Sequence, residues 1–215
     1  MKPLVIVFEG IDCSGKSNII RLVMNELDSN KAILLKGVDN VDEKNYRDLL
    51  VNKDIITDVH IRATLYNSAL SECYEKILTS IALKKEIILL DRSHISMFAY
   101  QHKANPINIF NNSYTKVRWE KILATCNVVF IYLNVDENIL KERYSNKEDK
   151  DYSDIVTFTD NYKSIIQEYN KIQNMENMSY YQFHNLINNN LDDVRRNVDY
   201  VRNLIKALSM ESFIY

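Results

Sequence analysis

The sequence predicts an α/β protein with a doubly wound, five-stranded parallel sheet and helices on both faces. Short apolar runs alternate along the chain with longer stretches of helical periodicity, as in folds built from strand–helix–strand crossovers. No segment rich in Pro, Gly or Ser divides the 215 residues, and a chain of that length can bury one substantial core. We therefore expect a single domain over residues 1–215.

The apolar runs mark the predicted strands. Leu4–Phe8 is continuously apolar, as expected for a central strand covered on both faces. The runs "AILL" at 32–35, "EIILLD" at 86–91 and "VVFIYLNV" at 128–135 follow, and "YYQFH" at 180–184 is a less apolar fifth candidate. Ligands of such sheets bind beyond the carboxyl ends of the strands, so we expect the functional residues in the loops that follow them.

Helical stretches lie between these runs. The first, Ser17–Leu27, follows the opening strand and carries the apolar positions of a helix with one buried face. The others are expected at 54–83 (as one helix or two), 96–101, 116–125, 138–144, 155–174 and 191–208. A charged loop, "SNKEDKDYSD" at 145–154, separates two of them.

The composition argues against several classes of protein. A net charge of −2 and a sequence pI of about 6.1 disfavour nucleic acid as a partner, although a local basic groove is compatible with them. No run approaches the roughly 20 apolar residues that a membrane span needs. Cys13, Cys73 and Cys126 lie far apart without metal-ligand spacing, which is typical of a cytoplasmic protein and predicts no zinc site.

The loop after the first strand has the spacing of a phosphate-binding loop. Residues 10–17, "GIDCSGKS", fit G-x-x-x-x-G-K-[ST] and hold two of the three glycines in the chain. Gly10 and Gly15 allow the backbone N–H groups to approach phosphate oxygens closely. Lys16 would sit on the β- and γ-phosphates of a nucleotide, and Ser17 would hold Mg²⁺. The alternative is a glycine turn that only joins a strand to a helix.

A second pair of charged residues follows the strand at 86–91. Asp91 and Arg92 would reach the same edge of the sheet as the phosphate loop. Asp91 would hold Mg²⁺ through water, and the planar fork of Arg92 would neutralise a transferring phosphoryl group. The alternative here is a surface ion pair at a strand end.

Two longer motifs extend these signals. "FEGIDCSGKS" (8–17) fits FEG-x-[DE]-x-[SA]-GK-[ST], and "DRSHISMFAYQ" (91–101) fits DR-x-x-x-S-x-x-AYQ. Both are motifs of thymidylate kinases, and the chain resembles that family over nearly its whole length. The resemblance implies a P-loop kinase fold with a short lid at 145–154. It implies a homodimeric enzyme of nucleotide biosynthesis that uses ATP and Mg²⁺ to phosphorylate dTMP.

The resemblance also implies roles for individual residues. ATP would be held by the loop residues Gly10, Asp12, Cys13, Ser14, Gly15, Lys16, Ser17 and Asn18, with Arg143 reaching the phosphates from the edge of the lid. The acceptor would be bound by Asp12, Lys36, Tyr66, Arg92, Ser96, Tyr100, Gln101 and Tyr152. Among these, Asp12 would face the sugar 3′-hydroxyl, Tyr66 would stack on the base, and Tyr152 would close over the sugar.

Each of these carried-over roles has an alternative. Tyr66 and Tyr100 would also fit as ordinary core aromatics, and Asp12 as a helix N-cap. Arg143 would also fit on a solvated helix face. Cys13, at the start of a helix, would suit a redox switch, but a position that simply tolerates a modest side chain is the preferred interpretation.

The chain departs from the family pattern at several phosphate-binding positions. Some thymidylate kinases have an arginine where this chain has Cys13, and others carry lid arginines where 145–154 offers only Lys147 and Lys150. The arginine that binds the acceptor phosphate in the family is missing: this stretch offers Lys36, with Asn40 near the expected position and Arg47 further on. The arginine that reads the base is missing too, because its position falls on Leu70 or a neighbour, none of which is arginine. The motifs therefore predict ATP as the donor and leave the identity of the acceptor open.

Two further hypotheses follow from these departures. A deoxynucleoside kinase needs no acceptor-phosphate arginine but does need a general base, which Asp12 or an acid between Asp39 and Glu43 would supply. A related acceptor is a modified pyrimidine hydroxyl in DNA. The other hypothesis is a catalytically weak nucleotide-binding regulatory protein, against which the joint presence of Lys16, Ser17, Asp91 and Arg92 argues.

Overall fold

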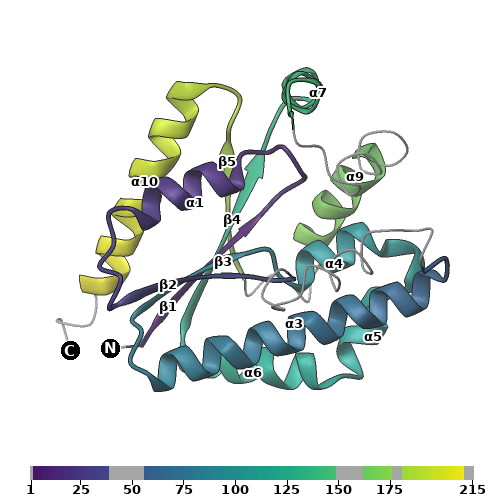
Figure 1. Ribbon diagram of the computed structural model, residues 1–215, viewed down its shortest axis with the longest axis horizontal. Helices are drawn as coiled ribbons and strands as arrows, with labels where there is room; N and C mark the ends of the chain where they lie inside the picture. Colours follow the sequence, from purple (N-terminus) through teal and green to yellow (C-terminus); the bar gives the residue numbers. More distant parts are fainter. Residues whose placement is uncertain (1, 39–55, 149–161, 176–180, 211–215) are drawn as a thin grey trace.

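The computed structural model describes residues 2–38, 56–148, 162–175 and 181–210. Within these ranges the chain forms one five-stranded sheet in the order β2-β3-β1-β4-β5 (Figure 1). All four neighbouring pairs of strands are parallel. The predicted doubly wound parallel sheet is confirmed.

The strand positions agree with the apolar runs, with one shift. The strands are β1 (Leu4–Glu9), β2 (Ala32–Lys36), β3 (Ile87–Asp91), β4 (Asn127–Asn134) and β5 (Gln182–Ile187). The fifth was expected at 180–184 but extends to Ile187, because Phe183 to Ile187 continue the ladder with β4 up to Asn134. As an edge strand with many exposed positions, β5 lacks the continuous apolar run that marks the inner strands.

The described residues form eight helices, all but one of them in intervals where the sequence predicts a helix. They are α1 (Lys16–Met24), α3 (Val59–Ala82), α4 (His94–Tyr100), α5 (Pro106–Asn111), α6 (Tyr114–Thr125), α7 (Glu137–Ser145), α9 (Tyr162–Gln173) and α10 (Leu191–Met210). A 3-10 turn, η1 (His102–Ala104), follows α4. No helix within the described ranges is long and apolar enough to cross a membrane.

The helix expected at Ser17–Leu27 already ends at Met24, and residues 155–161 of the helix expected at 155–174 lie outside the described residues. Two other helices differ more from the sequence-based expectation. The stretch expected at 54–83 as one helix or two is one helix from Val59, and the side chain of Asp58 caps it by accepting from the backbone N–H groups of His60 and Ile61. The short helix α5 was not predicted. It begins at Pro106, directly after Asn105 in a left-handed conformation, so its start depends on a turn rather than on apolar periodicity.

The sheet separates two hydrophobic cores. Helices α1 and α10 cover one face, and α3, α4, α6 and α9 lie on the other (Figure 1). Every residue of β1 is buried, and alternate side chains enter opposite cores, with Ile6 on the α1–α10 side and Val7 on the other. The strand that carries the phosphate loop is therefore the most enclosed element of the sheet.

The register of the strands brings three loops to one edge. Phe8 of β1 and Lys36 of β2 are both paired with Asp91 of β3. The residues that follow each strand therefore start at the same level of the sheet. Among them are the phosphate loop, Gly37 and Arg92, which meet beyond the carboxyl ends as expected for a parallel sheet.

Candidate active site

The phosphate loop joins β1 to α1 and is tightly held by its surroundings. Gly15 has φ +91°, and a β-carbon there would lie 2.4 Å from Nδ2 of Asn188. Cys13 also takes a left-handed conformation, with φ +62°, although it is not a glycine. Gly15 is the N-cap of α1, so the alternative that Asp12 caps this helix is wrong.

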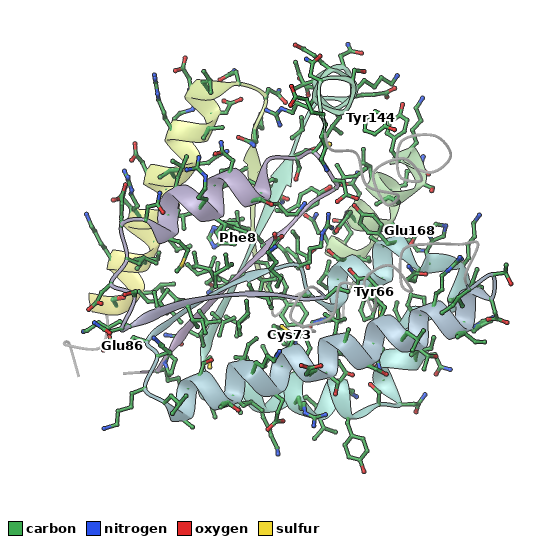
Figure 2. The ribbon with its side chains drawn as sticks, in the orientation of Figure 1. Phe8, Tyr66, Cys73, Glu86, Tyr144 and Glu168 are labelled. Atoms are coloured by element: carbon green, nitrogen blue, oxygen red, sulfur yellow. The ribbon has the colours of Figure 1, made fainter. Side chains whose placement is uncertain are left out.

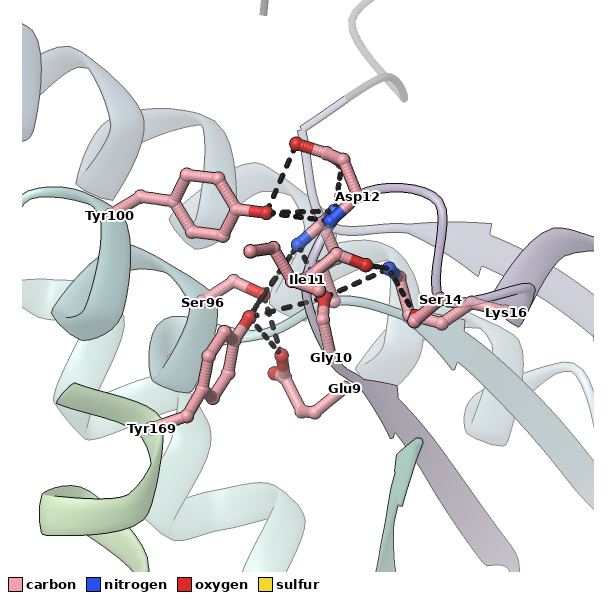
Figure 3. Close-up of polar contacts among 10 residues, drawn as sticks. Glu9, Gly10, Ile11, Asp12, Ser14, Lys16, Ser96, Tyr100 and Tyr169 are labelled. Atoms are coloured by element: carbon pink, nitrogen blue, oxygen red, sulfur yellow. Dashed lines mark hydrogen bonds and ion pairs between the residues drawn. The ribbon is translucent and has the colours of Figure 1, made fainter. Parts of the chain in front are cut away.

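Lys16 is buried at the first position of α1. Its Nζ donates to the carbonyl oxygens of Gly10 at 2.9 Å and Ile11 at 3.0 Å (Figure 3). Burial, with the nearby charge of Arg92, lowers the pKa of Lys16 to about 8. The lysine is therefore held across the mouth of the loop, where an anion would compete favourably with neutral carbonyls.

Arg92 lies beside the loop and pairs with Asp12. The Nη2 group of Arg92 forms an ion pair with Oδ1 of Asp12 and also donates to the hydroxyl of Tyr100 at 3.4 Å. That hydroxyl donates to Oδ2 of Asp12 at 3.0 Å and accepts from the Asp12 backbone N–H at 3.0 Å. The alternative of a surface ion pair between Asp91 and Arg92 is wrong, since the partner of Arg92 is Asp12 and both side chains are more than four-fifths buried.

The other half of the Arg92 guanidinium faces a buried polar network. Its Nη1 donates to the Gly10 carbonyl at 3.2 Å, to Oγ of Ser96 at 3.2 Å and to the hydroxyl of Tyr169 at 3.5 Å. Ser96 Oγ and the Tyr169 hydroxyl both contact Oε2 of Glu9, which is fully buried (Figure 3). Arg92 is thus held by two different sets of acceptors.

Asp91 and Ser17 are the residues expected to hold Mg²⁺, and their setting fits that ion. Oδ1 of Asp91 is buried and has no hydrogen-bond partner among the described residues. Ser17 is exposed in the first turn of α1, next to Lys16. No group of three His, Cys, Asp or Glu able to hold a metal occurs in the described ranges. Mg²⁺ commonly binds through one or two protein oxygens together with substrate phosphates, and Ser17 and Asp91 each offer an oxygen of that kind.

Arg143 and Asn188 both donate hydrogen bonds to backbone carbonyls of the phosphate loop. Nη1 of Arg143 donates to the carbonyls of Cys13 at 3.4 Å and Ser14 at 3.5 Å, and its Nη2 donates to the Asn188 carbonyl at 2.7 Å. Nδ2 of Asn188 donates to the Ser14 carbonyl at 2.7 Å. The alternative that Arg143 lies on a solvated helix face is therefore wrong.

The remaining predicted residues lie on α3, at the end of α4, at the end of β2 and on α1. Tyr66 is half-buried on α3 and packs against the core (Figure 2). Gln101 is the C-cap of α4. Lys36 is exposed at the end of β2, and Asn18 accepts a hydrogen bond from Arg21 on the surface of α1. The expectations on Tyr152, Asn40, Arg47, Lys150 and the acids from Asp39 to Glu43 lie outside the described residues.

Four residues of this site were not predicted from the sequence. They are Glu9, Ser93, Tyr169 and Asn188. Glu9 did give a signal, because a charged residue ends an otherwise continuous apolar strand. Tyr169 and Asn188 gave none, since each meets the loop across more than 150 residues of sequence.

The sheet order, the phosphate loop and the arginine beside it define the class of phosphate-loop nucleotide kinases. A family model described as thymidylate kinase matches residues 8–197, and the chain belongs to the thymidylate kinase family. It is an ATP-dependent nucleotide kinase.

Individual relatives agree with this assignment. A thymidylate kinase of Malacoplasma penetrans is 29% identical over 187 residues, covering 82% of this chain and 85% of the relative. One of Campylobacter jejuni subsp. doylei is 31% identical over 148 residues, covering 67% and 71%. The crystal structure of the Ehrlichia chaffeensis thymidylate kinase shares the fold, with a TM-score of 0.62 and 18% identity over 95% of this chain and all of that one. The Candida albicans enzyme gives a TM-score of 0.66 at 16% identity, covering 97% and 93%.

Proposed function

We propose that this kinase transfers the γ-phosphoryl group of ATP to dTMP, giving dTDP and ADP. The observation that carries the proposal is the convergence of two cations on one backbone oxygen. Lys16 and Arg92 both donate to the Gly10 carbonyl, at 2.9 and 3.2 Å. A transferring phosphoryl group spreads negative charge over its oxygens, so two converging cations stabilise it in transit.

On the donor side, Lys16 exchanges its carbonyl acceptors for the β- and γ-phosphate oxygens. Backbone N–H groups of residues 15–17, at the start of α1, add donors for the phosphates. Asn18, in the first turn of α1, also contacts ATP in this proposal. Arg143 holds the loop through its hydrogen bonds to the carbonyls of Cys13 and Ser14. Ser17 and Asp91 would hold Mg²⁺, which when bound neutralises charge on the phosphates.

On the acceptor side, Arg92 exchanges Asp12 for the incoming phosphoryl oxygens. The freed Asp12 carboxylate then accepts a hydrogen bond from the sugar hydroxyl of the acceptor. The Tyr100 hydroxyl stays bonded to both the backbone N–H and the carboxylate of Asp12, so the loop keeps its shape during the exchange. Ser96, Gln101, Tyr66, Lys36 and Tyr152 complete the acceptor pocket in this proposal.

The test compares acceptors directly. ADP release is measured with dTMP, other deoxynucleoside monophosphates, thymidine and duplex DNA under the same conditions, with Lys16→Ala as the inactive control. We expect dTMP to give the largest kcat/KM. Turnover of thymidine with inert dTMP would replace the proposal by a deoxynucleoside kinase, and turnover of DNA alone by a modified-base kinase. Tight ATP binding without turnover of any acceptor would indicate a regulatory protein.

We also propose that the enzyme is a homodimer. Helices α3 and α6 pack together, and both carry exposed apolar side chains: Ile61 is 53%, Tyr114 80% and Val117 47% exposed. Apolar groups on one pair of helices suit a self-complementary interface. Sedimentation equilibrium of the wild type and of Tyr114→Glu is the test, and a monomeric wild type would contradict the proposal.

A further inference from the structure

Glu9 is an unusual residue for the end of a central strand. It is fully buried and lies directly before Gly10 of the phosphate loop. It is neither one of the two residues expected to hold Mg²⁺ nor a member of the ion pair between Arg92 and Asp12. Burial raises the pKa of Glu9, while hydrogen bonds from Ser93 and Ser96 and the charge of Arg92 oppose that shift. A buried carboxyl group costs stability unless its surroundings use it.

The donors around Glu9 fit the ionised carboxylate. Oε1 accepts from the backbone N–H of Ser93 at 2.8 Å and from its Oγ at 2.7 Å. Oε2 accepts from Oγ of Ser96 at 2.5 Å and from the hydroxyl of Tyr169 at 3.2 Å. Each oxygen therefore meets two donors, and a carboxyl proton would have to displace one of them.

Ser96 transmits the state of Glu9 to Arg92. A serine hydroxyl has one proton, and the short contact with Oε2 of Glu9 uses it. The lone pairs of Ser96 Oγ are then available to Nη1 of Arg92, which lies 3.2 Å away. Without the carboxylate charge, the serine hydroxyl is free to rotate, and Arg92 loses an oriented acceptor.

Tyr169 adds a second route of the same kind. Its hydroxyl lies 2.8 Å from Ser96 Oγ and within 3.5 Å of both Nη1 of Arg92 and the Gly10 carbonyl. The contacts of Arg92 with Gly10, Ser96 and Tyr169 all fall on Nη1, while Asp12 and Tyr100 contact Nη2. The two ends of the guanidinium are therefore held independently.

We propose that Glu9 is a positioning residue for Arg92. Through Ser96 and Tyr169 it fixes Nη1 of the guanidinium, so that Nη2 exchanges Asp12 for phosphoryl oxygens without the side chain leaving the site. This inference rests on the role of Arg92 in the proposed function. It assigns to the buried acid of the first strand a task in phosphoryl transfer that is separate from binding either substrate.

The test is a double-mutant cycle between Glu9→Gln and Arg92→Ala. Glutamine keeps the size of the side chain and removes its charge. Misplacing a reacting group by about 1 Å costs on the order of 100-fold, so we expect Glu9→Gln to lower kcat about 10- to 100-fold. The KM for ATP should stay within about threefold, because Lys16 and the loop N–H groups are untouched.

The cycle distinguishes positioning from a general structural effect. If Glu9 acts through Arg92, Glu9→Gln changes the residual kcat of Arg92→Ala by less than about twofold. An equal loss of activity in both backgrounds would overturn the inference. Full activity of Arg92→Ala alone would instead remove the role given to Arg92 in the proposed function. These two failures are therefore distinguishable.

A second variant covers the case in which Glu9→Gln does not fold. Tyr169→Phe removes only a hydroxyl, and its loss of kcat should likewise vanish in the Arg92→Ala background. Tyr132→Phe is the matched control, because Tyr132 is a buried tyrosine whose ring packs against Tyr169 at 5.2 Å. We expect it to leave kcat unchanged, and additive effects of Tyr169→Phe and Arg92→Ala would overturn the inference.

Discussion

The carbonyl oxygen of Arg92 occupies the space that a side chain on Gly37 would need. A β-carbon at position 37 would lie 2.6 Å from that oxygen and 3.1 Å from the carbonyl carbon. Arg92 itself has φ +72°, a left-handed conformation that is costly for a residue with a side chain. The chain therefore uses the one glycine outside the phosphate loop to let the loop after β2 approach the backbone of Arg92.

Gly37→Ala should weaken catalysis by displacing Arg92. The added methyl group meets backbone atoms rather than a flexible side chain, so either loop must move. We expect kcat to fall about tenfold, since sub-ångström displacement of a catalytic group is expensive. Steady-state kinetics with saturating ATP measures the effect. A variant with wild-type kcat would show that the backbone of Arg92 is not fixed by this contact.

The affinity for ATP should fall as the pH rises above neutrality. The pKa of Lys16 is lowered to about 8, first by burial and then by Arg92, so the lysine of the free protein loses its proton near that pH. Between pH 7.5 and 9 we expect a loss of affinity of about 5- to 10-fold, because only the charged lysine binds phosphate strongly. Titration calorimetry in two buffers of different ionisation enthalpy also detects the expected uptake of a proton.

Lys16→Arg is the control for this pH dependence. An arginine stays charged over the whole range, so its affinity for ATP, although lower, should change little between pH 7.5 and 9. Parallel pH profiles for the wild type and this variant would contradict the assignment to Lys16.

Acid should destabilise the fold through His94. This residue is fully buried at the start of α4, and burial lowers its pKa to about 3. Between about pH 6.5 and 3 the unfolded chain binds a proton at this histidine that the folded chain does not. The free energy of unfolding therefore falls as the pH falls through that window, by about 1–3 kcal/mol between pH 7 and 4.5.

Urea unfolding of His94→Phe at both pH values tests this account. The phenylalanine ring fits the stacking against Phe110, whose centroid lies 4.5 Å from that of His94. The variant loses the hydrogen bond with Tyr74, so its stability at pH 7 should be lower, but its further loss at pH 4.5 should be smaller than that of the wild type. His60→Gln, at an exposed position of α3, should behave as the wild type. Equal pH-dependent losses in His94→Phe and the wild type would remove His94 as the cause.

Asn188→Ala should weaken ATP binding without altering Lys16. The Nδ2 group of Asn188 holds the Ser14 carbonyl at 2.7 Å, and its loss leaves that part of the loop with the longer bond from Arg143. We expect the Kd for ATP to rise about 5- to 10-fold, the cost of one buried hydrogen bond. Asn189→Ala is the matched control, because Asn189 bonds to Asp136 instead. Equal effects of the two variants would contradict the role given to Asn188.

The parts of this structure that local sequence determines were predictable. The continuous apolar run before Gly10 and the acid that ends the run at 86–91 located β1 and β3 and placed Lys16 and Asp91 at one edge of the sheet. What the sequence did not reveal are pairings between distant segments. Arg92 meets Asp12 across 80 residues, and Tyr169 meets Glu9 across 160. No periodicity encodes such partners, which become visible only when the helices pack.

The hydrogen bond between Asn188 and the phosphate loop can form only late in the synthesis of this segment. The loop leaves the ribosome before Asn188, and the bond between them spans 174 residues. At a synthesis rate of roughly 5–20 residues per second, about 9 to 35 s separate the two partners. During that interval the nascent chain carries a nucleotide loop whose carbonyls have not yet met their asparagine. ATP retention by stalled chains of increasing length should therefore increase once Asn188 has emerged and can bond to Ser14.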